Sequence, residues 1–147
     1  MRIFLDANVL FSAAKSDGAI RQLLALLAKD GHMLCADGYV VEEARRNLAA
    51  KFPASASYLD QLLVKVELIP ILGRPADQAT YGLPEKDRPI MAAAIAGRCD
   101  VLVTGDKTHF GALYGARMEG VEVLSPAMLA SRAVSYTHLT LPTNREV

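Results

Sequence analysis

Four acidic side chains, three of them at an expected strand end or helix start, are the groups in this chain best suited to chemistry. They are Asp6, Glu43, Asp87 and Asp106. Asp6 follows the apolar run of residues 3–5, and Asp106 follows the apolar run of residues 101–105. In open α/β folds, ligands bind beyond the carboxyl ends of parallel strands. Carboxylates that meet there repel one another unless a cation neutralises them. The pattern therefore predicts a divalent-metal site and, with it, phosphate chemistry.

The expected ligand atoms indicate which metal ions fit such a site. Carboxylate oxygens that leave room for bound waters suit Mg²⁺ or Mn²⁺. One or two such ions could orient a water molecule, lower its pKa and stabilise the charge that develops on a phosphodiester. Asn8 and Thr104 would supply an amide and a hydroxyl beside the carboxylates. The sequence leaves open whether one ion or two are held.

Each acid also has a purely structural interpretation. Asp6 and Asp106 could be ordinary N-caps of the helices that follow them, and Asp87 could lie at a helix start because the helix dipole favours it there. Glu43 lies inside an expected helix, where a solvated face is the commoner position for a lone glutamate. For Asp6 the two interpretations weigh about equally. The functional interpretation rests on all four acids converging, which makes coincidence less plausible.

Short apolar strands alternate with amphipathic helices along the chain. Strands are expected over residues 2–6, 33–36, 66–72, 100–104 and 121–124. Helices are expected over residues 8–15, 18–29, 38–52, 87–97, 107–114 and 126–133, with a further helix capped by Ser55. Pro70 inside the third strand favours an edge position or a bend. This alternation predicts an α/β fold in which helices cover both faces of a mostly parallel sheet.

Composition narrows the class of protein. The 147 residues fit one domain, and no apolar run approaches the roughly 20 residues of a membrane helix. Cys35 and Cys99 have no metal-type spacing, so we expect reduced thiols in or near the core and a cytoplasmic protein. The formal net charge is zero, whereas a general nucleic-acid binder usually carries excess positive charge. A nucleic-acid partner would therefore need local basic residues, a metal ion or a dimer surface.

The last segment of the chain differs from the rest. Residues 135–147 are polar and threonine-rich, are interrupted by Pro142 and show no regular period. We therefore expect one domain over residues 1–134, followed by a tail that is non-native or disordered.

Four segments together resemble the PIN domain family. They are residues 3–10 (IFLDANVL), 41–44 (VEEA), 87–94 (DRPIMAAA) and 100–107 (DVLVTGDK). The likeness spans about residues 1–130, and its most specific part runs from Asp87 to Asp106. It implies a three-layer α/β/α sandwich around a mostly parallel sheet, and a ribonuclease that depends on Mg²⁺ or Mn²⁺.

The resemblance also implies roles for individual residues. The implied catalytic metal ligands are Asp6, Glu43, Asp87 and Asp106, with Asn8 and Thr104 as supporting polar residues. Glu43 is preferred to its neighbour Glu42 because the family's acid directly precedes an Ala- or Leu-type residue, here Ala44. Asp100 begins its strand, so we expect it at the opposite edge of the sheet with a structural role.

Many small bacterial PIN domains are toxins of toxin–antitoxin pairs, similar to VapC. That likeness implies a homodimer that cuts RNA and is silenced by a small antitoxin protein. Arg88 and Lys107 flank two of the acids and are the preferred RNA contacts, by adjacency alone. His109 could reach a phosphate at the rim of the site, but we interpret it as a partly exposed helix residue.

Two other functions stay open. A PIN-like module could keep its acids and yet process RNA or bind a partner without being a toxin; a neighbouring gene for a DNA-binding antitoxin would favour the toxin. A metal-dependent phosphatase ranks last, because its two aspartates one residue apart would require an acid where Asn8 stands.

Overall fold

The computed structural model describes the backbone of residues 1–70 and 82–140 and the side chains of residues 1–70 and 82–133. The strands are β1 (Arg2–Leu5), β2 (Met33–Asp37), β3 (Val66–Ile69), β4 (Val101–Val103), β5 (Arg117–Met118) and β6 (Val121–Leu124). The α-helices are α1 (Ala7–Lys15), α2 (Ala19–Lys29), α3 (Gly38–Lys51), α4 (Ala56–Leu63), α5 (Arg88–Ala96), α6 (Lys107–Phe110) and α7 (Pro126–Thr140). Short 3₁₀ helices are η1 (Pro53–Ser55), η2 (Glu85–Asp87) and η3 (Gly111–Leu113).

The strands form one six-stranded sheet in the order β3-β2-β1-β4-β6-β5. All neighbouring pairs are parallel except β5 and β6, which are antiparallel. The side chains of residues 3–5, 34–36 and 101–103 are buried, as expected for parallel strands that are covered on both faces. The predicted mostly parallel sheet is confirmed.

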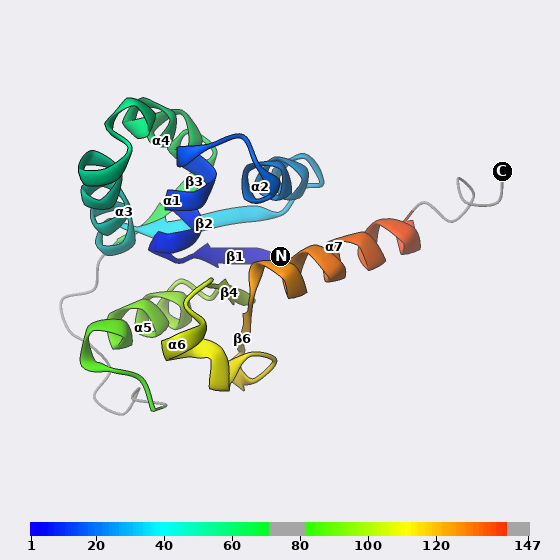
Figure 1. Cartoon of the computed structure of the whole chain (residues 1–147). Coiled ribbons are helices and arrows are strands. Elements are labelled where there is room, and N and C mark those ends of the chain that lie inside the picture. The colour runs from blue at the N-terminus through cyan, green and yellow to red at the C-terminus, as the bar shows by residue number, and fades with distance from the viewer. Residues whose placement is uncertain (71–81, 141–147) are drawn as a thin grey trace, which may run out of the picture.

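Helices cover both faces of this sheet (Figure 1). The helices α1, α2, α3 and α4 lie on one face, and α5 and α6 lie on the other. Parallel strands are joined by right-handed crossovers, so the chain puts its helices on one face while it moves from β1 towards β3. The return from β3 to β4 runs in the opposite direction and therefore puts α5 on the other face. The predicted α/β/α sandwich is confirmed.

The strand order reverses beside β1. From β1 the chain moves outward to β2 and β3, and it then returns to place β4 on the other side of β1. We call the region beyond the carboxyl ends of β1 and β4 the switch point, and ligands of open α/β sheets usually bind at such a place. Asp6 follows β1 at this point, and Thr104 follows β4. Strand topology therefore brings together residues that lie far apart in the sequence.

Several element boundaries differ from the prediction. β3 ends at Ile69, so Pro70 follows this edge strand instead of interrupting it, and residues 71–72 lie outside the described part of the chain. Ser55 precedes α4 but makes no capping hydrogen bond, because its Oγ donates to the carbonyl of Lys15. The prediction of a Ser55 cap was therefore wrong. β5 was missed because two residues are too few to show a period.

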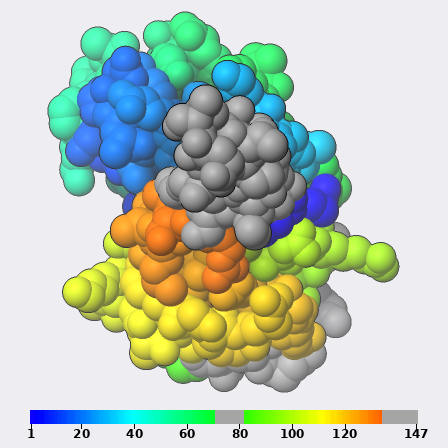
Figure 2. Space-filling model, turned by 90° about the vertical axis from the view of Figure 1, so that its right-hand side faces the viewer, coloured from blue at the N-terminus to red at the C-terminus, as the bar shows by residue number. Residues whose placement is uncertain are grey.

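α7 is longer than predicted. It runs from Pro126 to Thr140, into the segment that differs in composition, and residues 141–147 lie outside the described part of the chain. Figure 2 shows the first part of α7 (orange) between atoms of the N-terminal segments (blue) and of the segment before β6 (yellow). Leu129 and Ala133 are buried there. Their burial fixes the start of α7 to the body of the domain.

The cysteines agree with the sequence prediction. Cys35 lies in β2 and Cys99 lies just before β4, and both are free and buried. Within residues 1–70 and 82–140, no helix is both long enough and apolar enough to cross a membrane.

Asp37 ends β2 and caps α3, a role that the sequence analysis did not assign. Its Oδ1 accepts a hydrogen bond of 3.1 Å from the amide of Val40, and only 3% of its surface is exposed. Burial raises the pKa of Asp37, and backbone donors oppose this shift. A buried cap of this kind fixes the start of the helix that carries Glu43.

Replacing Asp37 with Asn is expected to raise the thermal unfolding midpoint at pH 7 by a few degrees. The pKa of this carboxyl group is higher in the folded state than in the unfolded state. Stability therefore falls as the pH rises from the unfolded-state pKa through the folded-state pKa. Asn keeps an acceptor for the amide of Val40 and removes the cost of ionising a buried group. Below both pKa values, at pH 3, the two proteins should unfold at the same temperature. Calorimetry at both pH values measures the effect, and an equal or lower midpoint for the variant at pH 7 contradicts it.

Candidate active site

The switch point holds two linked groups of polar side chains. The first group consists of Asp6, Asn8 and Thr104. The second group consists of Asp87, Asp106 and His109, whose ligand-type atoms all lie within 4.8 Å of one another. The hydroxyl of Thr104 joins the groups, because it donates to Asp6 and accepts from the amide of Asp106.

Hydrogen bonds hold both carboxylate oxygens of Asp6. Its Oδ1 accepts from the amide of Ala7 at 2.7 Å. Its Oδ2 accepts from Thr104 Oγ1 at 2.7 Å and from Asn8 Nδ2 at 3.3 Å. The amide of Asp6 donates to the carbonyl of Val103 at 3.1 Å, which extends the contact between β1 and β4 by one residue. Asp6 therefore caps α1 and also lies at the switch point, so both interpretations of its sequence position apply.

Asn8 ties the end of β1 to the end of β4. Its Nδ2 donates to Asp6 and lies 3.4 Å from Thr104 Oγ1, and its Oδ1 accepts from the amide of Gly105 at 2.7 Å. A Cβ atom on Gly105 would lie 3.3 Å from that Oδ1, a tight contact that glycine avoids. A carboxylate in place of the Asn8 amide could not donate to Asp6. The local structure therefore requires an amide at the position where the phosphatase pattern would require an acid.

Thr104 is fully buried, and its hydroxyl supports two acids. Oγ1 donates to Asp6 at 2.7 Å and accepts from the amide of Asp106 at 3.1 Å. The backbone of Thr104 is also fixed, because its amide donates to the carbonyl of Leu124 at 3.1 Å and its carbonyl accepts from Tyr114 Oη at 2.8 Å. The start of the loop after β4 is thereby fixed by contacts with Asp6, Leu124 and Tyr114.

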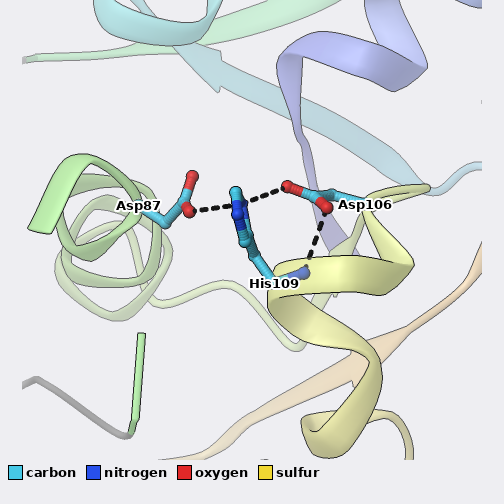
Figure 3. Close-up of side chains that lie close together, drawn as sticks. All are labelled: Asp87, Asp106 and His109. Carbon is cyan, nitrogen blue, oxygen red and sulfur yellow. Dashed lines mark hydrogen bonds and ion pairs between the residues drawn. The ribbon is translucent and has the colours of Figure 1, made fainter. Parts of the chain in front are cut away.

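The ring of His109 lies between the carboxylates of Asp87 and Asp106 (Figure 3). Its Nδ1 is 2.9 Å from Asp87 Oδ2 and 2.9 Å from Asp106 Oδ2. The other oxygen of Asp106 accepts from the amide of His109 at 3.1 Å and caps α6. Asp106 thus uses one oxygen as a helix cap and presents the other to the imidazole.

Asp87 has no capping role. It directly precedes α5, but its side chain makes no capping hydrogen bond. The side chain is only 9% exposed, and among the described residues its Oδ2 and the Nδ1 of His109 are buried atoms without a hydrogen-bond partner. The two atoms are close enough for an ion pair but are not aligned for a hydrogen bond. Burial of such atoms is costly unless a further group satisfies them.

Glu43 lies half-buried on α3 and acts on the site through its charge. Burial raises the pKa of Asp6 and of Tyr39, and the charge of Glu43 raises both further. Glu42 is exposed and lies 3.8 Å from Arg46 on the same helix. Glu42 therefore occupies the solvated face, which favours Glu43 as the acid of the site. Glu43 is outside the group whose ligand atoms lie within 4.8 Å of one another.

The acids of the site make one another harder to ionise. Burial raises the pKa of Asp6 to about 6; hydroxyl and backbone donors oppose this shift, whereas Glu43 and Asp87 increase it. Burial likewise raises the pKa of Asp87, with His109 opposing the shift and Asp106 adding to it. A divalent cation would favour the ionised carboxylates. The electrostatics therefore fit a site that binds a cation.

The residues around the acids differ in how firmly they are held. Arg88 is half-buried, and its Nε donates to the carbonyl of Leu83 at 3.2 Å, so it supports the segment before α5. Lys107 is exposed at the start of α6. Tyr39 Oη donates to the carbonyl of Lys86 at 2.8 Å and ties α3 to η2. Lys107 is therefore the freer of the two basic residues predicted to contact RNA.

Two residues show where reasoning from the sequence succeeded and where it fell short. Asp100 accepts a hydrogen bond of 2.8 Å from the amide of Arg2 at the amino end of β1, at the edge and in the structural role predicted for it. His109 was predicted to be a partly exposed helix residue, and it does lie in α6 with its side chain 30% exposed, but its contacts with two acids were not predicted. It follows Asp106 by three residues, the spacing at which helical side chains meet. That spacing was the available signal.

Comparisons with solved structures agree with this architecture. A chain of VapBC2 from Rickettsia felis, solved bound to a DNA fragment of its promoter, aligns with a TM-score of 0.60 and 21% identity, over 85% of this chain and 98% of the other. VapBC-1 from nontypeable Haemophilus influenzae aligns with a TM-score of 0.56 and 15% identity, over 86% and 99%. FitAcB from Neisseria gonorrhoeae aligns with a TM-score of 0.51 and 19% identity, over 84% and 97%. At these identities the likeness establishes the fold.

Comparison of the sequence with families of proteins is more specific. A search of curated proteins found no match. The family model described as the PIN domain matches residues 2–108. That range includes Asp6, Glu43, Asp87 and Asp106, the four acids of the candidate site. The chain belongs to the PIN domain family.

Proposed function

We propose that this protein is a metal-dependent endoribonuclease that hydrolyses RNA phosphodiester bonds and acts as the toxin of a toxin–antitoxin pair. PIN domains are generally nucleases, and the similar structures are VapBC and FitAB assemblies. The observation that carries the proposal is the gathering of Asp6, Asp87 and Asp106 at the switch point, where Thr104 links Asp6 to Asp106 and His109 lies between the other two.

The donor set fits a divalent cation. Asp87 Oδ2 is buried without a hydrogen-bond partner among the described residues, and Asp106 Oδ2 is not the oxygen used for capping. The proposed ligands of Mg²⁺ or Mn²⁺ are Asp6, Glu43, Asp87 and Asp106. A bound ion supplies Lewis acidity and a water of lowered pKa. Asn8 and Thr104 keep Asp6 in one orientation through hydrogen bonds to its Oδ2.

Recognition of RNA is proposed to rely on local contacts. The formal net charge is zero, so affinity for phosphate must come from individual cations and from the bound metal ion. Lys107, exposed and next to Asp106, is the leading contact; Arg88 is the second. We further propose a homodimer, a small antitoxin partner and a cytoplasmic setting, by analogy with the VapBC and FitAB assemblies.

Divalent metal is expected to stabilise the purified protein and to start RNA cleavage over the same concentration range. A ligand that binds only the folded state stabilises it by about 2.7 kcal/mol at a concentration about a hundredfold above its Kd. The thermal unfolding midpoint should therefore rise with Mg²⁺ or Mn²⁺ and return to its starting value with EDTA. Fluorimetric melting and gel analysis of an end-labelled RNA, in one metal titration, measure both effects. Stabilisation by metal without RNA cleavage would support the proposed metal site and contradict the proposed nuclease activity.

Expression in a bacterial host tests the proposed toxin role. Induction of the wild type should arrest growth and leave new RNA ends, which sequencing can map, whereas Asp106→Ala should do neither. Cleavage in vitro without growth arrest would favour the alternative of an RNA-processing enzyme.

A further inference from the structure

Three ligand-type atoms from different segments converge beside the switch point. Asp87 ends η2, Asp106 lies in the loop after β4, and His109 lies in α6. The Nδ1 of His109 is 2.9 Å from one carboxylate oxygen of each acid (Figure 3). Ligand atoms about 2.1 Å from a metal ion and at right angles to one another lie about 3 Å apart. The spacing is therefore that of neighbouring ligands on one ion.

Two of the polar atoms in this group are buried and have no hydrogen-bond partner among the described residues. Asp87 Oδ2 and His109 Nδ1 are buried, and neither completes a hydrogen bond within the described part of the chain, although they lie 2.9 Å apart. The Asp87 side chain is only 9% exposed, so bulk water has little access to its carboxylate. A lone pair on each atom that points at a shared cation would satisfy both groups at once.

The donor set also limits the kind of cation. Mg²⁺ prefers oxygen ligands in a near-ideal octahedron, whereas divalent transition metals accept imidazole nitrogen as well as carboxylate oxygen. We propose that His109 is a metal ligand, and that Asp87, Asp106 and His109 bind a divalent transition-metal ion such as Mn²⁺ in preference to Mg²⁺. This inference rests on the proposed metal site and adds to it a nitrogen ligand and a preference among ions.

The same contacts have one rival explanation. A protonated imidazole between two carboxylates would itself act as the neutralising cation and would have to leave before a metal ion could bind. The two explanations predict opposite effects of removing the ring. A true ligand strengthens metal binding, so that its loss weakens binding. A competing internal cation opposes metal binding, so that its loss strengthens it.

His109→Gln is the variant that separates these explanations, and His32→Gln is its matched control. His32 lies in the loop before β2, where its Nδ1 is 2.9 Å from the amino group of Met1. By calorimetric titration of the full chain, the wild type should bind Mn²⁺ at least about tenfold more tightly than Mg²⁺. His109→Gln should lose about tenfold in Mn²⁺ affinity and little in Mg²⁺ affinity, whereas the control should bind as the wild type does.

Pulsed electron paramagnetic resonance of bound Mn²⁺ gives a direct readout that needs no catalysis. The wild type and His32→Gln should show coupling to a ligand nitrogen, and His109→Gln should lose it. A wild-type spectrum without nitrogen coupling overturns the proposal, even if the variant does not fold. Tighter binding of both ions by His109→Gln overturns it in favour of the internal cation. RNA cleavage is measured separately. Cleavage by a protein that binds Mn²⁺ through oxygen atoms alone overturns only the proposal that His109 is a ligand. Nitrogen coordination without RNA cleavage overturns only the proposed nuclease activity.

Discussion

Asp6→Asn is expected to slow RNA cleavage by at least about a thousandfold while the protein stays folded. Asp6 is buried at the switch point, and its Oδ2 accepts from both Thr104 and Asn8. An amide has almost the same shape but carries no charge for a metal ion. It keeps an oxygen for the amide of Ala7, and the hydroxyl of Thr104 can turn to accept from the new donor; only the longer hydrogen bond of 3.3 Å from Asn8 Nδ2 is lost. The loss should therefore fall on metal binding and chemistry, measured as single-turnover cleavage over a Mn²⁺ titration that reaches saturation.

The matched control for this variant is Asp100→Asn. Asp100 is also an aspartate beside the sheet, but it accepts from the amide of Arg2 at the other edge. The control should cleave RNA at the wild-type rate, and circular dichroism should show that both variants are folded. If Asp6→Asn cleaves as fast as the control, then Asp6 has no part in the reaction.

Thr104→Val is expected to lower both stability and activity. Valine has nearly the shape of threonine, but it leaves Asp6 Oδ2 without its shortest hydrogen bond and leaves the amide of Asp106 without an acceptor. An unsatisfied buried polar group costs about 1–3 kcal/mol, and loss of a group that orients a metal ligand typically reduces activity by about 10–100-fold. Urea unfolding and kcat/KM for RNA cleavage measure the two losses.

Thr104→Ser provides the control for that substitution. Serine keeps the hydroxyl and removes only a methyl group, so it should restore most of the activity lost in Thr104→Val. The metal titration should separate the same pair, with weaker Mn²⁺ binding in the valine variant. Equal activity of the valine and serine variants would mean that the hydroxyl does not position Asp6.

The parts of this site that sequence could predict are those governed by local rules. Asp6 and Asp106 were found because an acid that follows a buried parallel strand must lie at the ligand-binding edge of the sheet. Asp100 was placed at the opposite edge by the same rule. Glu43 was separated from Glu42 only by resemblance to the family, and the exposure of Glu42 beside Arg46 now gives a physical reason for the choice.

The parts that sequence could not predict depend on contacts between distant segments. Thr104 was predicted to support the acids, but which acid its hydroxyl holds depends on Asp6, far away in the chain, lying 2.7 Å from it. The position of His109 between two acids depends on how the end of η2 and α6 lie relative to each other beside the loop after β4. Ser55 is the opposite case, a contact that was predicted but is absent. Its sequence position favours a helix cap, but its hydroxyl donates instead to the carbonyl of Lys15 in a distant segment. Periodicity and capping preferences contain no information about such pairings.

The two oxygens of Asp106 have separate duties, one as the cap of α6 and one facing His109. A substitution of Asp106 can therefore keep the helix cap and remove the negative charge, since serine or asparagine can still cap a helix but is uncharged. A variant altered in this way would keep the start of α6 in place and, under the proposed function, would lose metal-dependent cleavage. If the proposed function is right, RNA bound by this variant would not be cleaved, and the variant could be used to isolate RNA substrates from cells.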